Sequence, residues 1–365
     1  MHVHTSDDDL DRVNRRIVTL LTAGIWIGIF IAGLWPFNFI PNNGVRWLPG
    51  DAGLHFDGYG QVYSSAPIVL LGDAEGFASA TVEIVFTPAQ SYNTASTFFS
   101  LVKKNDLSFG IGQSLTDLFV EGSFMGPRGE LVPKLWIDHV CGRGKELFVT
   151  VTLGSRHVDV YIDGRPTISF SGTARSDNIS GNIIVGHSVN SGERWNGTVA
   201  RVAVLQSAFD ASEIGVRYEQ WIRTRHLDKD VNHEAAAYEF VTPAVGFVRN
   251  IGEIGPYLAV PKTFRLFKPT VLEWPDRLNR SVVIDAIINI AGFIPFGLGT
   301  CLCLRLWTRW RISRCIAMTI LAGASVSLGI ELLQVLLPTR DSSLADLVTN
   351  IMGATIGAAA TIIGK

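Results

Sequence analysis

The sequence contains few of the residues that mark disulfide, metal or redox chemistry. Only four of its 365 residues are cysteines, and it has no Cys-x-x-Cys pair, His-Glu-x-x-His run or P-loop. The eight histidines are scattered, and no Asp/Asn run has the spacing of a calcium loop. We therefore predict no metal site and no bound cofactor.

Charge is also scarce. Only 18% of the residues are charged, the formal net charge is −2, and no basic patch is present. Phosphate backbones are bound by clustered Lys and Arg, so a nucleic-acid partner is not expected. With 47% hydrophobic residues and a mean hydropathy of +0.26, the chain is too apolar for one ordinary soluble domain.

The apolar residues gather in four long runs. Each run has at least 19 residues, close to the roughly 20 that cross a bilayer. The runs are Ile17–Trp35, Val282–Leu304, Ile316–Leu337 and Leu344–Ile363. No small-x-small cleavage site follows the first run, so we expect an uncleaved anchor; a cleaved signal peptide is the alternative. The pattern predicts a four-span helical membrane domain.

The basic residues predict which way the spans run. They cluster before the first run, between the second and third, and at the C-terminus, at Arg12, Arg15, Arg16, Arg305, Arg309, Arg311, Arg314 and Lys365. Four spans with an inside N-terminus put all three clusters on the cytoplasmic side. The segment between the first two runs and the 338–343 link then lie outside.

Polar residues stand near the other ends of the same runs. Two Asp/Asn pairs have the same sequence spacing. The first is Asp285-x3-Asn289-Ile-x-Gly292, and the second is Asp346-x3-Asn350-Ile-x-Gly353. Residues four apart share a helical face. The predicted orientation places all seven at the extracytoplasmic ends of the spans: Asp285, Asn289, Glu331, Gln334, Arg340, Asp346 and Asn350. The repeat further predicts a duplicated two-helix unit, with glycines 292, 297, 299, 353 and 357 at close helix contacts.

Two interpretations of these polar residues remain open. In the first they join helices, and Arg340 forms a structural ion pair with Glu331 or Asp346. In the second they line a polar pocket that opens outward and receives a lipid head group or a lipid-linked molecule. Buried charge in a membrane is expensive, and three carboxylates with one arginine exceed what helix joining needs.

At these residues the chain resembles the VanZ-like family of membrane proteins. The matching stretches are Leu34-Trp-Pro-Phe-Asn-Phe39, Asp285-x3-Asn289 with Gly292-Phe-Ile-Pro-Phe-Gly297, and Glu331-Leu-Leu-Gln334 continuing through Pro338-Thr-Arg-Asp341 to Asp346-x3-Asn350-x2-Gly353. The resemblance implies a bacterial protein of the cell envelope without an established reaction. Unlike short family members, this chain carries a large insertion after the first span.

The insertion has the pattern of an all-β sandwich. Short alternating strands recur between turn residues, as in Ala80–Phe86 and Lys145–Thr152, and Asp163-Gly164 marks a hairpin. From about Val45 to Trp221 the sequence resembles laminin-G-like and concanavalin-like jelly rolls. Such folds often bind glycans or proteins. A sugar platform and a conventional core are alternative readings of Tyr63, Tyr92, Trp136, His187, Arg194 and Trp195. No strand carries the paired carboxylates of a glycosidase.

Together these patterns predict a mixed fold, a multi-pass bacterial plasma-membrane protein with an inserted extracytoplasmic jelly roll. The expected parts are a cytoplasmic N-terminus (1–16), a first transmembrane helix (17–39), the β-sandwich (45–225), a membrane-proximal linker (226–281) and a VanZ-like domain with three spans (282–365).

For function, we expect a non-enzymatic accessory protein. Its sandwich would bind a polysaccharide or a protein, and its polar pocket a membrane lipid or lipid-linked glycan. The alternative is a membrane enzyme acting on a polyprenyl-linked or glycolipid substrate. In that case Glu331 or Asp346 would be the general base, and Arg340 would hold a phosphate.

Overall fold

A computed structural model describes most of the chain. The described residues are 5–50, 53–72, 75–89, 95–187, 189, 194–228, 234–241, 246–252, 255–267, 271–275 and 280–363. They form two compact units. Unit 1 consists of Met1–Phe39 and Pro269–Lys365, and unit 2 consists of Ile40–Lys268. The chain therefore leaves the first unit, forms the whole second unit, and returns.

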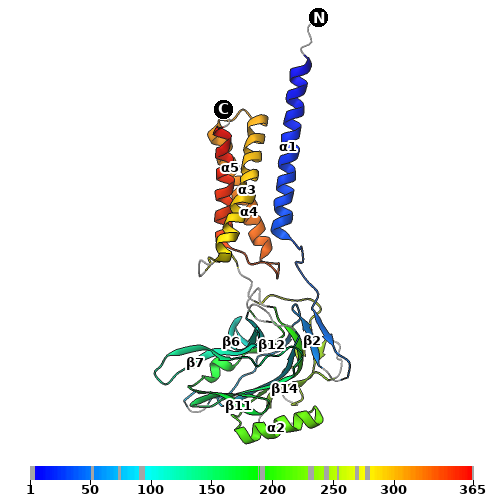
Figure 1. Cartoon of the computed structure of the whole chain (residues 1–365), viewed down its shortest axis with the longest axis vertical. Helices are drawn as coiled ribbons and strands as arrows, with labels where there is room; N and C mark the ends of the chain where they lie inside the picture. Colours follow the sequence, from blue (N-terminus) through cyan, green and yellow to red (C-terminus); the bar gives the residue numbers. More distant parts are fainter. Residues whose placement is uncertain are drawn as a thin grey trace. The chain divides into compact units, whose positions relative to one another are not determined.

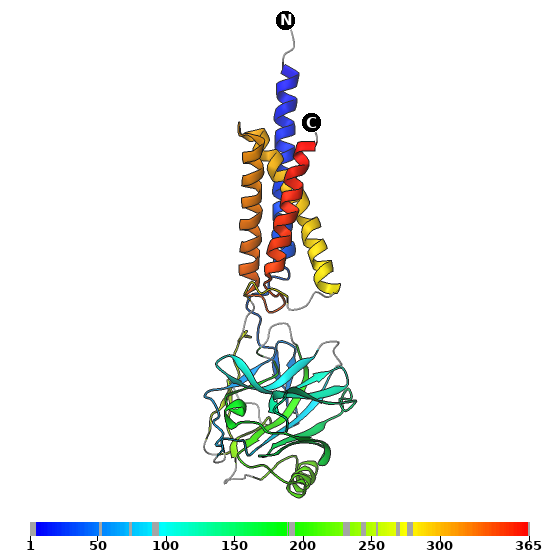
Figure 2. The same cartoon turned by 90° about the vertical axis from the view of Figure 1, so that its left-hand side faces the viewer.

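Unit 1 contains four long helices that run in alternating directions (Figures 1 and 2). They are α1 (Thr5–Leu34), α3 (Arg280–Trp307), α4 (Ile312–Gln334) and α5 (Leu344–Ile363). Each includes a stretch long and apolar enough to cross a membrane. Large apolar side chains point away from the bundle, with Leu20 72% and Ile287 61% exposed. Such surfaces need a hydrocarbon environment, so the four predicted spans are confirmed.

Glycines bring α3 and α5 close together. A methyl group added at Gly297 would collide with the Ala354 carbonyl, and one added at Gly353 or Gly357 would collide with carbonyls of α3. Small residues allow helices to approach at backbone distance in membranes, where van der Waals packing drives association. Gly299 likewise faces Thr22 of α1, but Gly292 has open space around it. The expected close contact at Gly292 was therefore wrong.

Unit 2 is a sandwich of two antiparallel sheets. Sheet 1 has the order β1-β2-β13-β4-β9-β10-β11, with β14 also paired to β13; sheet 2 has the order β15-β16-β3-β12-β5-β6-β7-β8. The strands of sheet 1 are β1 (Val45–Trp47), β2 (Leu54–Asp57), β4 (Ala80–Pro88), β9 (Leu147–Leu153), β10 (His157–Ile162), β11 (Arg165–Ser171), β13 (Asn196–Leu205) and β14 (Glu234–Glu239). Those of sheet 2 are β3 (Val62–Ser64), β5 (Ser96–Lys103), β6 (Asp106–Ser114), β7 (Asp117–Met125), β8 (Leu131–Ile137), β12 (Asn182–Val185), β15 (Phe247–Val248) and β16 (Leu258–Ala259). A short 3-10 helix, η1 (Ser176–Ile179), precedes β12.

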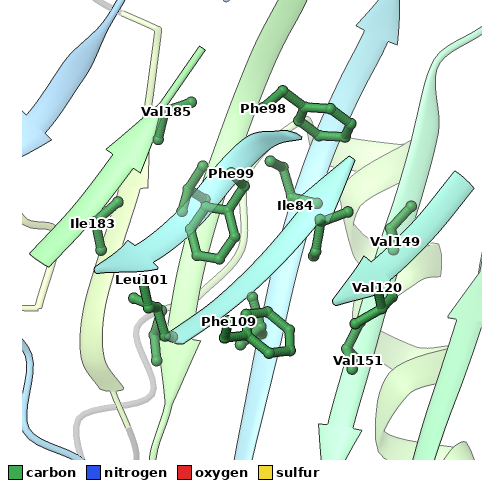
Figure 3. Packing of buried hydrophobic residues seen from close by; sticks show 14 of the residues in the cluster. Ile84, Phe98, Phe99, Leu101, Phe109, Val120, Val149, Val151, Ile183 and Val185 are labelled. Atoms are coloured by element: carbon green, nitrogen blue, oxygen red, sulfur yellow. The ribbon is translucent and has the colours of Figure 1, made fainter. Parts of the chain in front are cut away.

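The core lies between the two sheets. Alternate side chains of each strand point inward, as the period of two requires. Figure 3 shows Ile84, Val149 and Val151 of sheet 1 facing Phe99, Phe109 and Val120 of sheet 2. Cys141 is buried in the same core, and this burial raises the pKa of its thiol to about 12. The predicted all-β sandwich is therefore confirmed.

The sandwich extends further along the chain than the sequence indicated. Residues 226–281 were expected to be a membrane-proximal linker, but β14, β15 and β16 lie within this range and pair with both sheets. Phe264, within the expected linker, is 5% exposed and packs edge-on against Tyr59 and His187. Short strands that pair with partners far along the chain carry little local signal, which is why they were missed.

Helix α2 (Ala211–Thr224) covers the outer face of sheet 1 (Figure 1). Asp210 and Glu213 form a capping box at its start. Arg217 of this helix binds Glu83 of β4 through two hydrogen bonds of 2.5 and 2.8 Å. Glu83 is 0% exposed and also lies 3.7 Å from Arg201 of β13, which bonds Glu239 of β14 at 2.7 Å. This buried ion network was not predicted from the sequence.

Candidate functional site

One end of the helix bundle collects the polar residues of unit 1. Because the helices alternate in direction, the C-terminal ends of α1 and α4 meet the N-terminal ends of α3 and α5 (Figure 2). We call this the polar end, and the seven residues predicted from the sequence the polar cluster. At the opposite end lie the arginines that join α3 to α4, and Arg305 bonds the Thr361 carbonyl there at 2.9 Å.

Glu331 holds the link between α4 and α5. Its side chain is 1% exposed, and its Oε2 atom accepts a hydrogen bond of 2.7 Å from the backbone N–H of Ser343. Ser343 precedes α5, and its hydroxyl accepts from the backbone N–H of Asp346 at 3.4 Å. The residue preceding a helix normally satisfies free N–H groups in this way. Here a carboxylate from a neighbouring helix adds to that cap, at the end where the helix dipole favours negative charge.

Asp346 joins α5 to α3. The carboxamide of Asn289 donates a hydrogen bond to its carboxylate, and the charges of Asp285 and Arg340 both act on it. The charge of Asp346 acts in turn on Glu331. Asp285 is exposed, whereas Asn289 and Asp346 are half-buried. The residues that begin the two repeated motifs therefore lie together in space.

Two carboxamides lie close by. Asn350 is 5% exposed, and its Nδ2 atom donates to the Ser327 hydroxyl of α4 at 2.9 Å. Gln334 is 7% exposed, and its Nε2 atom donates to the Gly33 carbonyl of α1 at 2.8 Å. These bonds tie α5 to α4 and α4 to α1. The carboxamide oxygens of both residues are buried without a partner.

Arg340 has a different role from the ones expected. Its Nε and Nη2 atoms donate to the carbonyls of Trp35 and Ala32, at 3.3 and 3.4 Å. A cation at the C-terminal end of a helix complements the dipole and satisfies free carbonyls. Within the described residues no carboxylate forms an ion pair with Arg340. The ion pair with Glu331 or Asp346 that the helix-joining interpretation includes is thus not formed among them, although the charge of Arg340 acts on Asp346.

Several residues that complete the polar end were not predicted from the sequence. The backbone of Glu273 pairs with the start of α5, donating to Ser342 and accepting from Leu344 at 3.3 and 3.1 Å. Ser343 was detectable, because a serine directly before an apolar run is an N-cap signal. The partners Ser327 and Gly33 were not, because neither has a distinctive local pattern.

Two of the residues considered for a sugar platform, Trp195 and His187, lie in the core of the sandwich instead. Trp195 is 0% exposed, stacks on Phe98 at 4.6 Å and donates to the Gln113 carboxamide at 2.9 Å. His187 is also buried, and Tyr92 lies outside the described residues. The reading of these aromatics as core is correct for Trp195 and His187. Trp136 is 45% exposed on β8, beside Phe119.

The described residues hold no group of three or more His, Cys, Asp or Glu side chains arranged to hold a metal ion.

These features define a membrane protein with four apolar helices, a polar end and an inserted lectin-like sandwich. Residues 235–365 match the family model described as VanZ/LLP1. Residues 57–215 match the family model described as Concanavalin A-like lectin/glucanases superfamily. The chain thus combines a VanZ-like region with a concanavalin-like domain, and both expected resemblances are confirmed. The Leu34–Phe39 stretch lies outside the matched residues.

Solved structures match the chain at low identity. A putative carbohydrate binding protein from Bacteroides ovatus is 13% identical with a TM-score of 0.38, covering 56% of this chain and 59% of that one. A sialidase from Trypanosoma rangeli in complex with sialic acid is 14% identical with a TM-score of 0.35, covering 52% and 30%. The chain spans less than two thirds of either structure's length. No curated protein matches the chain.

Proposed function

We propose that this protein is a non-enzymatic accessory protein of the bacterial cell envelope. Its helices hold a lipid head group or a lipid-linked molecule at the polar end. The observation that supports this is the gathering of all seven predicted polar residues at one end of an otherwise apolar bundle. Polar and ionisable groups cost free energy in a membrane, so such a concentration points to a bound polar molecule.

The contacts of the polar cluster favour lipid binding over catalysis. Glu331 is 1% exposed and already bonded to the backbone, which leaves it poorly placed as a general base. Arg340 uses one edge of its guanidinium on helix carbonyls. If the alternative of a membrane enzyme holds, Asp346 is the better base, because it is half-buried beside the exposed Asp285.

Native mass spectrometry of the purified full-length protein tests lipid holding. The protein should retain lipid, and Asp346→Ala should lower the retained fraction severalfold. Asp341→Ala is the matched control, since Asp341 is an exposed carboxylate five residues earlier in the chain. If wild-type protein retains no lipid, or if both variants retain as much as the wild type, the lipid-binding proposal is wrong.

We further propose that the sandwich lies on the extracytoplasmic side and binds a glycan. Trp136 is the aromatic residue we would test first, because its exposed ring is available for stacking on a sugar. Full-length protein applied to a glycan array should bind, and Trp136→Ala should reduce that binding. A silent array would instead favour a protein partner for the sandwich.

A further inference from the structure

The acidic groups at the polar end outnumber the basic ones. The polar cluster contributes three carboxylates, those of Asp285, Glu331 and Asp346, and Arg340 is its only cation. Neighbouring described residues add the exposed carboxylates of Glu273 and Asp341, and the exposed Arg280 at the start of α3. Among the described residues of this end, carboxylates therefore outnumber cations, which disfavours a phosphate there.

Arg340 offsets this imbalance only in part. A guanidinium binds phosphate most strongly through two parallel N–H groups. The pair formed by Nε and Nη2 already donates to the carbonyls of Trp35 and Ala32. Recognition of a phosphate along that edge would require α1 to lose both bonds. These contacts argue against the phosphate-holding role that the membrane-enzyme alternative gives Arg340.

Buried acceptors without partners give a second and independent observation. In the described part of unit 1, three buried side-chain atoms lack a hydrogen bond: Gln334 Oε1, Thr339 Oγ1 and Asn350 Oδ1. Gln334 lies one turn from Glu331 on α4, and Asn350 lies one turn from Asp346 on α5. A buried carboxamide oxygen without a donor costs free energy. Two such oxygens beside the acidic groups indicate that hydrogen-bond donors are missing from this end.

The excess of carboxylates and the unpaired carboxamide oxygens both favour a ligand that carries positive charge and donates hydrogen bonds. We propose that the polar end binds the protonated primary amine of a lipid head group, such as that of phosphatidylethanolamine. An ammonium group has three N–H donors and no acceptor, so it offers donors to carboxylate and carboxamide oxygens and balances the negative charge. This inference rests on the proposed lipid-holding function and narrows it to one class of head group.

Head-group selectivity tests the inference on the full-length protein. Nanodiscs made with equal parts of phosphatidylethanolamine, phosphatidylcholine and phosphatidylglycerol supply three head groups for comparison. Phosphatidylcholine keeps the positive charge but has no N–H donor, and phosphatidylglycerol has neither. Native mass spectrometry after release should show phosphatidylethanolamine enriched about tenfold among retained lipids, since charge-assisted hydrogen bonds are strong.

Variants that remove one negative charge test whether the polar end causes this head-group selectivity. Asp346→Asn should abolish the enrichment, and Glu219→Gln, on the exposed side of α2 in unit 2, should leave it intact. If Asp346→Asn does not fold, Asp285→Asn at the exposed start of α3 replaces it, with the same expectation. Equal retention of phosphatidylcholine, or preference for phosphatidylglycerol, overturns the amine inference while lipid holding stands. Retention of no lipid at all overturns both.

Discussion

At the residue scale, both units bury carboxylates and stabilise them differently. In the sandwich, Glu83 is completely buried between Arg217 and Arg201, so its charge is met by two cations. In the membrane unit, Glu331 is nearly as buried but is met by a backbone N–H at the start of a helix. The first arrangement fixes a helix on a sheet, and the second fixes the turn between two spans.

The Glu83 network predicts a large local effect on stability. Glu83→Gln keeps the shape but removes the charge that Arg217 and Arg201 share. Breaking a buried ion pair from one side typically costs about 3–5 kcal/mol. Hydrogen exchange measured by mass spectrometry should therefore speed up in β4 and α2. Glu219→Gln, on the exposed side of α2, is the control and should change little. Unchanged exchange in Glu83→Gln would contradict a stabilising network.

At the element scale, the two copies of the repeated motif occupy unlike surroundings. Gly353 of α5 packs against the backbone of α3 at Ile290, whereas the equivalent Gly292 of α3 has open space around it. Asn350 is buried against α4, whereas Asn289 is half-buried beside Asp346. The expected duplicated helix pair stays a prediction, and the sequence repeat does not produce equivalent contacts.

This difference gives a matched pair of substitutions. Gly353→Ala places a methyl group against the Ile290 carbonyl and should lower thermal stability, since overpacking costs about 1–3 kcal/mol. Gly292→Ala should be neutral or slightly stabilising, because alanine favours a helix over glycine by roughly 1 kcal/mol. Thermal unfolding of the detergent-solubilised protein compares the two. Equal losses in both variants would show that α3 and α5 do not pack as described.

At the scale of the whole molecule, the arginines of the α3–α4 link and the polar cluster occupy opposite ends of the bundle. Basic residues favour the cytoplasmic side. The chain enters and leaves the sandwich at the ends of α1 and α3 that belong to the polar end. We therefore predict that the sandwich and the polar end lie outside, with the α3–α4 link inside.

Cysteine labelling in intact cells tests this topology. A membrane-impermeant maleimide should label Arg128→Cys, in an exposed turn of the sandwich, without permeabilisation. Arg309→Cys, in the α3–α4 link, should react only after permeabilisation. The native Cys141 should give little background, because its buried thiol has a pKa of about 12 and stays protonated. The opposite labelling pattern would reverse the orientation.

The sequence alone determined the main architecture. Run length predicted four spans, period-two alternation predicted the sandwich, and the ends of the runs predicted which polar residues gather. These signals are local or depend on simple counting, so they are readable from the sequence without knowing which residues are in contact. The Ser343 cap was also within reach of the sequence, because its signal lies in adjacent residues.

Only the tertiary structure decided which partner each polar group takes. It assigned Arg340 to the carbonyls at the end of α1, Glu331 to the Ser343 N–H, and the strands β14, β15 and β16 to the sandwich. These outcomes depend on groups distant in sequence that come within about 3 Å, a distance set by packing of the whole unit. A side chain's type fixes what it is able to bind, and the fold fixes which of the available partners lies within reach.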